Sequence, residues 1–177
     1  MLHRALKFAY RNHKKQDRDG ESPLPYLTHV VDVVNKLRYL GGETDSDVLA
    51  AGFLHDILEE TDATEAEVRE RFGDRVADLV MELTREEPSG EVAAVLPLEE
   101  LYELRSQLLL DGIARMSPEA MRVKLADRLS NLEGARATRP EEKLRQYEAQ
   151  SRKLLEIIPR DVCPELWDRI RGLVEPL

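Results

Sequence analysis

The chain has 177 residues, of which 34% are charged and only 5% aromatic, with 26 Lys and Arg against 35 Asp and Glu. The length is that of one domain, the low aromatic content argues against an all-β sandwich, and the net charge of −9 disfavours nonspecific binding to nucleic acid. The single cysteine excludes an internal disulfide, and no run approaches the roughly 20 apolar residues of a membrane-spanning helix.

Helical spacing dominates the first part of the chain. Apolar residues recur with a helical rhythm over residues 2–14, and a loop rich in Gly, Pro and charge follows. A second helical run begins at Thr28 and stops at the glycine pair 41–42, a favourable C-terminal signal. Residues 44–60 open with capping residues and are apolar almost all round, which predicts one central, buried helix.

Shorter segments follow this central helix. Thr64 with Glu67 three residues later has the pattern of a capping box, which predicts a short acidic helix that ends at Gly73. Residues 74–84 predict another helix. The segment 85–97 has the weakest pattern in the chain, and we expect it to be an exposed loop or lid.

The remainder of the chain is again helical. Residues 98–115 predict a long helix, and Ser117 caps the next one, which is expected to end near Gly134. Two further helices open at prolines, one over residues 140–158 and a short one from Pro164.

The pattern as a whole predicts an all-α fold class. No segment alternates with period two for long enough to predict a strand, and no repeat or linker divides the chain. The start of the chain lacks the apolar run of a secretory signal. We therefore expect a single cytoplasmic domain over residues 1–177, with no nucleic-acid or membrane partner; a homo-oligomer is an open alternative.

Polar residues stand in apolar surroundings at His29, at the adjacent pair His55 and Asp56, and at Asp127. An ionised carboxylate buried there is strongly unfavourable unless it is paired or bound to a metal. Two imidazoles and two carboxylates suit Mn²⁺, Fe²⁺, Zn²⁺ or Mg²⁺, with positions open for water and substrate. The alternative is a set of satisfied core histidines and a carboxylate paired with an arginine, such as Arg128.

A second acidic pair lies one turn beyond the first. Glu59 follows His55 by four residues, and Glu60 follows Asp56 by four, so a continuous helix would cluster these side chains. A carboxylate near a metal ligand could orient or deprotonate an attacking water. The alternative is that both glutamates begin a solvent-exposed acidic patch.

Five strings occur in the order found in a known enzyme family. They are ALKFAYRNHKKQDRDG, PYLTH, AAGFLHDILEETDAT, RFGDRVADLV and VKLADRLSNL, and they span roughly residues 2–155. With them the chain resembles the HD-domain metal phosphohydrolases. More narrowly, it resembles the small alarmone hydrolases and the hydrolase domain of bifunctional alarmone synthetase/hydrolases. The resemblance implies a single HD-domain helical bundle that removes the 3′-pyrophosphate from (p)ppGpp, and no alarmone synthetase domain is visible.

The resemblance also implies a metal cofactor and its ligands. The family binds one catalytic Mn²⁺, for which Fe²⁺, Zn²⁺ or Mg²⁺ are alternatives. The matching positions in this chain are His29, His55, Asp56 and Asp127.

Further roles follow from the same resemblance. Glu59 and Glu60 fall on the pair that handles the hydrolytic water. Arg18 and Asn131 fall on positions that contact the substrate, a small anionic nucleotide. His13 falls near the pocket and is interpreted as support, without a role as a ligand. Further basic groups expected to neutralise phosphate charge are Lys14, Lys15 and Arg105, with Lys124 either joining them or pairing with a carboxylate.

Several positions depart from the family pattern. Glu60 replaces an Asp, Asp17 stands in a loop that is usually basic, and ESPLP is inserted before Tyr26. Val30 replaces a common Pro, and Ser130 a common His. These departures leave two alternatives open: an HD phosphatase for another nucleotide, such as a nucleoside monophosphate or NADPH, and a non-catalytic HD domain that binds a nucleotide.

Overall fold

A computed structural model describes residues 1–18 and 24–175. Within these ranges all regular structure is helical, and the extended backbone pairs only in an isolated bridge between Asp17 and Pro25. The predicted all-α fold class is confirmed.

The elements follow one another with short connections. They are α1 (Leu2–His13), α2 (Leu27–Asn35), a π-helical turn (Lys36–Leu40), α3 (Ser46–Leu54), α4 (Ile57–Glu60), α5 (Glu65–Phe72), α6 (Asp74–Leu83), α7 (Gly90–Val95), α8 (Leu98–Arg115), α9 (Pro118–Thr138), α10 (Glu141–Ile157), a 3₁₀ turn (Arg160–Val162) and α11 (Pro164–Val174).

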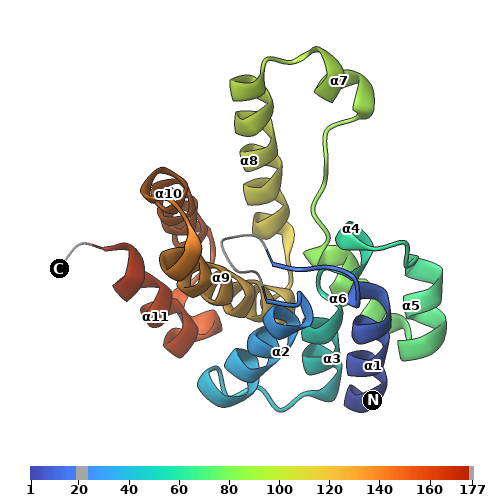
Figure 1. Cartoon of the computed structure of the whole chain (residues 1–177). Coiled ribbons are helices and arrows are strands. Elements are labelled where there is room, and N and C mark those ends of the chain that lie inside the picture. Colours follow the sequence, from blue (N-terminus) through green and yellow to red (C-terminus); the bar gives the residue numbers. More distant parts are fainter. Residues whose placement is uncertain (19–23, 176–177) are drawn as a thin grey trace.

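Two central helices, α3 and α9, organise the bundle (Figure 1). Helix α3 contacts α1, α2, α6 and α9, and every residue from Val48 to Leu54 is buried. Helix α9 also contacts α2, α6, α10 and α11, and it is buried without a break from Leu125 to Ser130. Because neighbours cover α3 on several sides, its sequence is apolar nearly all round, whereas α9 carries buried polar side chains among its apolar ones.

The prediction of one continuous helix over residues 44–60 is wrong. Helix α3 ends at Leu54, and α4 begins only at Ile57. Between them the backbone of Asp56 leaves the helical region, with φ −104° and ψ 5°. In a continuous helix, adjacent side chains diverge by about 100°. The break instead lets the side chains of His55 and Asp56 approach one another, so the i,i+4 argument for the two glutamates does not apply here.

Two other boundaries differ from expectation. Helix α9 continues past Gly134 and ends at Thr138. The next residue, Arg139, precedes Pro140, and the residue before a proline is disfavoured in a helix. The segment 85–97 is largely exposed, as expected, but it contains the short helix α7, whose N-terminus is capped by Ser89. The capping box at Thr64 is confirmed.

Helix α7 and the first turns of α8 project away from the remaining helices (Figure 1). This arm carries exposed apolar side chains at Val92, Val95 and Leu98. Over residues 1–18 and 24–175, no helix is both long and apolar enough to cross a membrane.

Candidate metal centre and active site

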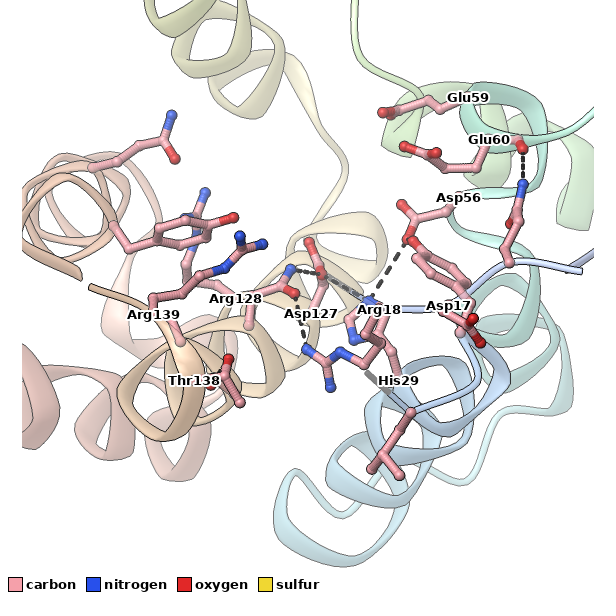
Figure 2. Close-up of a pocket in the computed structure, with 18 of the residues that line it drawn as sticks. Asp17, Arg18, His29, Asp56, Glu59, Glu60, Asp127, Arg128, Thr138 and Arg139 are labelled. Carbon is pink, nitrogen blue, oxygen red and sulfur yellow. Dashed lines mark hydrogen bonds and ion pairs between the residues drawn. The ribbon is translucent and has the colours of Figure 1, made fainter. Parts of the chain in front are cut away.

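A cleft of about 710 Å³ opens beside α9 (Figure 2). Its walls come from the loop after α1, from α2 and α4, and from α9 and α10. The cleft brings together all but one of the predicted site residues, namely Arg18, His29, Asp56, Glu59, Glu60, Asp127 and Asn131. The exception, His55, is buried directly behind them.

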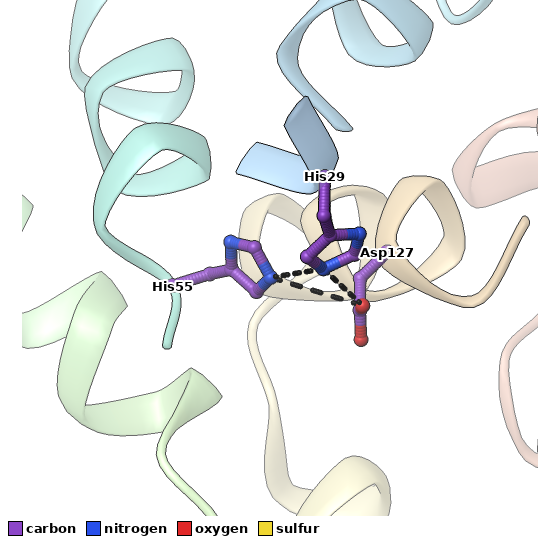
Figure 3. Close-up of side chains that lie close together, drawn as sticks. All are labelled: His29, His55 and Asp127. Carbon is purple, nitrogen blue, oxygen red and sulfur yellow. Dashed lines mark hydrogen bonds and ion pairs between the residues drawn. The ribbon is translucent and has the colours of Figure 1, made fainter. Parts of the chain in front are cut away.

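Three buried side chains form a compact donor cluster (Figure 3). His29 from α2, His55 at the end of α3 and Asp127 from α9 place ligand atoms within 4.8 Å of one another. The two Nε2 atoms are 3.2 Å apart, and His29 Nε2 lies 3.4 Å from Asp127 Oδ1. The cluster therefore joins three helices that are distant in sequence.

Asp56 adds a fourth donor to this cluster. Its Oδ2 atom lies 2.8 Å from His55 Nε2 and 3.6 Å from His29 Nε2. The Tyr26 hydroxyl donates a hydrogen bond to the same oxygen and orients the carboxylate. The four residues predicted to bind metal thus converge.

The hydrogen bonds behind the histidines indicate what the cluster is built to hold. His55 Nδ1 donates to the Gly52 carbonyl at 2.9 Å, and His29 Nδ1 contacts Ser130 Oγ at 3.0 Å. Both Nε2 atoms face the same space, where two carboxylates also converge. Two imidazole nitrogens and two carboxylate oxygens in this arrangement fit a divalent cation.

The same charges stabilise protons in the absence of a cation. Burial alone would lower the pKa of His55, but the Asp56 and Asp127 carboxylates outweigh burial and raise it to about 9. Burial works against ionised Asp127 too, yet Lys124 and His29 hold the pKa of that carboxyl well below its usual range. The site therefore strongly favours positive charge at its centre.

Lys124, and not Arg128, forms the ion pair with Asp127. The Lys124 Nζ atom lies 3.0 Å from Asp127 Oδ2. Among the described residues, Arg128 forms no ion pair, so the alternative in which it neutralises Asp127 is not what the structure shows.

The two glutamates of α4 both line the cleft but differ in their contacts (Figure 2). Glu59 Oε1 accepts the backbone N–H of Arg85 at 2.6 Å, and burial raises the pKa of Glu59. In the described part of the chain nothing donates a hydrogen bond to the Glu60 carboxylate, whose backbone carbonyl accepts from Gln16. Of the two carboxylates, that of Glu60 therefore accepts fewer hydrogen bonds from the described residues.

The predicted nucleotide contacts form a chain that leads to the metal cluster. Arg18 Nη2 is 3.5 Å from Asn131 Oδ1, and Asn131 Nδ2 donates to Asp127 Oδ1 at 2.6 Å. The guanidinium lies over Gly134, where an added Cβ would come within 2.8 Å of Arg18 Nη2. Gly134 thus provides the space in which Arg18 crosses α9.

Arg128 is a cleft residue whose role the sequence reasoning missed. It is 5% exposed, its guanidinium lies 6.0 Å from the centre of the Tyr147 ring, and its Nε has no hydrogen-bond partner. Burial lowers the pKa of this guanidinium. An arginine in the string KLADRLSNL, where Leu125, Ala126 and Leu129 indicate burial, was the available signal, because arginine is rarely buried without a partner.

Tyr26 was also missed as a site residue. Its ring stacks on His13, with centroids 4.8 Å apart, and its hydroxyl binds Asp56. His13 is buried and lies 2.5 Å from Gln16 through Nδ1, without lining the cleft. His13 therefore contacts two residues that line the cleft, Gln16 and Tyr26. The PYLTH string, which places a tyrosine three residues before His29, was the available signal.

Three basic residues expected near phosphate do not line the cleft. Lys14 and Lys15 are exposed outside it, and Arg105 Nε pairs with Glu87 at 2.9 Å. Lys14 and Lys15 follow the end of α1, and Arg105 lies in α8. Of the ESPLP insertion, residues 21–23 lie outside the described part of the chain.

Comparisons with known proteins agree with this site. A family model described as the HD domain matches residues 5–155. The human guanosine-3′,5′-bis(diphosphate) 3′-pyrophosphohydrolase MESH1 is 38% identical over 137 residues, which are 77% of this chain and 70% of that protein. The Drosophila melanogaster protein of the same name is 32% identical over 155 residues, 85% of this chain and 80% of that one.

A solved structure is similar over nearly the whole chain. It is reported as a metazoan ortholog of SpoT that hydrolyses ppGpp, and it matches with a TM-score of 0.83 at 30% identity. The match covers 97% of this chain and 92% of that one. Together with the four-donor cluster, these similarities place the chain plainly: it belongs to the HD domain family.

Proposed function

We propose that this protein is a guanosine-3′,5′-bis(diphosphate) 3′-pyrophosphohydrolase, which releases pyrophosphate from (p)ppGpp. The observation that carries the proposal is the convergence of four metal donors and two glutamates in one cleft. Relatives with this activity in their names match more than three quarters of the chain. The alternative of a non-catalytic nucleotide-binding domain is disfavoured, because the chain has a metal-binding side chain at each of the four donor positions and a glutamate at both positions beside them.

The metal in this proposal is Mn²⁺, held by His29, His55, Asp56 and Asp127. When bound, such an ion lowers the pKa of a water molecule and polarises a phosphoryl oxygen. The hydrogen bonds from Tyr26 to Asp56 and from His55 to Gly52 hold two of these ligands in place before the ion arrives.

Glu59 and Glu60 supply the proton chemistry of the proposal. Both lie beside Asp56 on the cleft wall, where a carboxylate can orient the attacking water and accept its proton. Water adds to the 3′-linked phosphorus, the bond from that phosphorus to the 3′ oxygen breaks, and pyrophosphate leaves. The nucleotide product retains its 3′ oxygen, which takes a proton from the solvent or from the protonated glutamate and so becomes a hydroxyl.

The cations of the cleft support an anionic substrate. Arg18, Lys124 and Arg128 line it in a protein whose net charge is −9. We assign Arg18 and Asn131 to the nucleotide and the unpaired Arg128 to phosphate oxygens, which a guanidinium can bind with two parallel hydrogen bonds. Tyr147 offers a ring beside the same guanidinium for stacking on a base.

The test uses Asp127→Asn, which keeps the side-chain volume but removes the charge. We expect bound Mn²⁺ and pyrophosphate release from ppGpp both to fall by at least about 100-fold, because a ligand and the partner of Lys124 are altered together. Asp168→Asn, on the exposed face of α11, is the control. Unchanged metal content and turnover in Asp127→Asn would contradict the site.

A phosphatase for another nucleotide is the second candidate. It is favoured by one observation: Lys14 and Lys15 lie outside the cleft, so the basic residues that face the substrate differ from those expected from the resemblance. A panel of ppGpp, nucleoside monophosphates and NADPH separates the candidates by product. Pyrophosphate release supports the first, and monophosphate release supports the second.

The proposal also covers the domain organisation and the cellular location of the protein. We propose that residues 1–177 form one domain that acts in the cytoplasm on a small nucleotide, since the chain has one cysteine and a strongly acidic composition. Size-exclusion chromatography with light scattering tests whether it forms a homo-oligomer.

A further inference from the structure

The arm formed by α7 and the first turns of α8 exposes a group of large apolar side chains. Val95, at the end of α7, is 78% exposed, and Leu98 at the start of α8 is 83% exposed. Tyr102, which lies one turn after Leu98 on the same face of α8, is half exposed. The arm projects away from the other helices (Figure 1), so these side chains remain open to solvent. Exposed apolar residues that are grouped in this way are typical of an interaction surface.

A groove of about 980 Å³ lies beside the arm, between α8 and α10. Its apolar lining includes the buried side chains of Leu101 and Leu110. Leu98 and Tyr102 line it as well, and Lys153 lines it from α10. The exposed apolar surface of the arm is therefore continuous with the apolar lining of the groove.

The arm and α10 carry opposite charge. Residues 90–104 contain four glutamates and no lysine or arginine, and in the described part of the chain none of these carboxylates forms an ion pair. Residues 143–153 on α10 contain four lysines and arginines against one acidic residue. Lys153 is exposed and forms no ion pair with any residue that the structure describes. The α8 wall of the groove carries Glu99 and Glu103, so its α10 side is the one that attracts an acidic arm.

These complementary surfaces lie in one chain but do not meet within it. Helix α7 stands apart from α10 at the far end of the arm (Figure 1). In two chains related by a two-fold axis, the arm of each reaches the groove of the other, so every contact is made twice. The repetition matters because a stable interface buries roughly 800 Å² on each partner. A second copy of this chain thus offers both the apolar lining and the charge that the arm requires.

We propose that the protein forms a two-fold dimer by exchange of its arms. In this dimer Val95 and Leu98 of each copy lie in the groove between α8 and α10 of the other, and Glu91 faces Lys153. Neither surface contains a metal donor or a residue assigned to the nucleotide. The inference is therefore independent of the reaction that the cleft catalyses.

Sedimentation equilibrium of the full chain over a range of protein concentrations tests the dimer. The mass should approach twice the chain mass of 20.3 kDa. Val95→Glu should raise the dissociation constant of the dimer at least about 100-fold, because an apolar side chain is lost from both contacts. Tyr39→Glu is the matched control, since Tyr39 is 81% exposed on the π-helical turn, and it should leave the dissociation constant unchanged.

Charge reversal on separate chains tests the exchange itself. Glu91→Lys on the arm and Lys153→Glu on α10 should each weaken the dimer about 10-fold or more, because like charges then face one another. An equal mixture of the two variants should recover the affinity, since both contacts of the mixed dimer pair a glutamate with a lysine. Lys7→Glu, exposed on α1, is the control for a reversed surface charge.

Three results would overturn the arm exchange. They are a single-chain mass of the unsubstituted protein at the highest concentration, an unchanged dissociation constant in Val95→Glu, or a mixture that dimerises no more tightly than its components. An arm that closes over the cleft of its own chain gives a different result. Val95→Glu would then raise KM for the nucleotide without any change in mass, which also contradicts the exchange.

Discussion

Glu59 and Glu60 are neighbours in α4 whose carboxylates meet different surroundings. Glu59 is tied to the start of the segment after α6 through the backbone N–H of Arg85, while the Glu60 carboxylate has no hydrogen-bond donor among the described residues. A general base must be able to release its partner and take the proton of water. These contacts favour Glu60 as the base and Glu59 as a side chain that positions the water and the adjacent loop.

Substitution of the two glutamates separates these roles. Glu60→Gln should lower kcat for ppGpp by about 10²–10⁴-fold while leaving Mn²⁺ affinity unchanged, because the amide cannot accept the proton. Glu59→Gln should lower kcat less, since the amide oxygen can still accept the Arg85 N–H. Glu156→Gln, exposed on α10, is the control for a lost surface charge. A larger loss in Glu59→Gln than in Glu60→Gln would reverse the assignment.

Whether a helix is continuous or broken decides which side chains face the cleft together. Helix α9 supplies Asp127, Ser130, Asn131 and Gly134 from successive turns of one continuous helix. Residues three and four apart lie on the same face, so this helix presents in a row the proposed metal ligand, the serine that contacts His29 and the proposed nucleotide contact. The break between α3 and α4 acts differently, because it turns the adjacent side chains of His55 and Asp56 toward the same point.

A substitution of Gly134 should change both the stability of α9 and the position of Arg18. Gly134→Ala should stabilise the protein by up to about 1 kcal/mol through helix propensity. The new Cβ would meet Arg18 Nη2 at 2.8 Å, so the flexible guanidinium must move away from Asn131. We expect KM for ppGpp to rise several-fold with little change in kcat, measured beside thermal unfolding.

The matched control for this substitution lies in another helix. Gly112 in α8 has open space where a Cβ would be placed, so Gly112→Ala should give a similar gain in stability without a change in KM. An unchanged KM in Gly134→Ala would show that the place of Arg18 over α9 does not matter for substrate binding.

The whole molecule converges on the metal centre. Its ligands come from α2, from the junction of α3 and α4, and from α9, all of which contact the same core. When no cation is present, the buried carboxylates stabilise a proton on His55, and a bound cation would supply that positive charge in its place. A bound cation should therefore stabilise the entire bundle and not only the cleft.

Thermal unfolding measures this coupling. At a Mn²⁺ concentration 100 times Kd, linkage gives about 2.7 kcal/mol of stabilisation, which should raise Tm by about 5–10 °C for a chain of this size. Removal of the ion with a chelator should reverse the shift. Asp127→Asn should have no comparable metal-dependent shift, whereas a shift of equal size in that variant would place the ion elsewhere.

Local patterns in the sequence were sufficient for the helical fold class and for most of the helices, although not for the break at Asp56 or for α7. Periodicity, caps and prolines predicted the helical class, since these signals act within a few residues. The resemblance carried by five ordered strings singled out the four donors now found together. The metal interpretation was accessible because buried His and Asp need partners, whatever the fold.

Only the tertiary structure decided how those residues act. The break at Asp56, the pairing of Asp127 with Lys124 in place of Arg128, and the exclusion of Lys14 from the cleft depend on contacts between distant helices. The contact of Ser130 with His29 likewise exists only because α2 lies against α9. Periodicity specifies which face of a helix is buried, but the partner that a polar group meets is set by packing across the core.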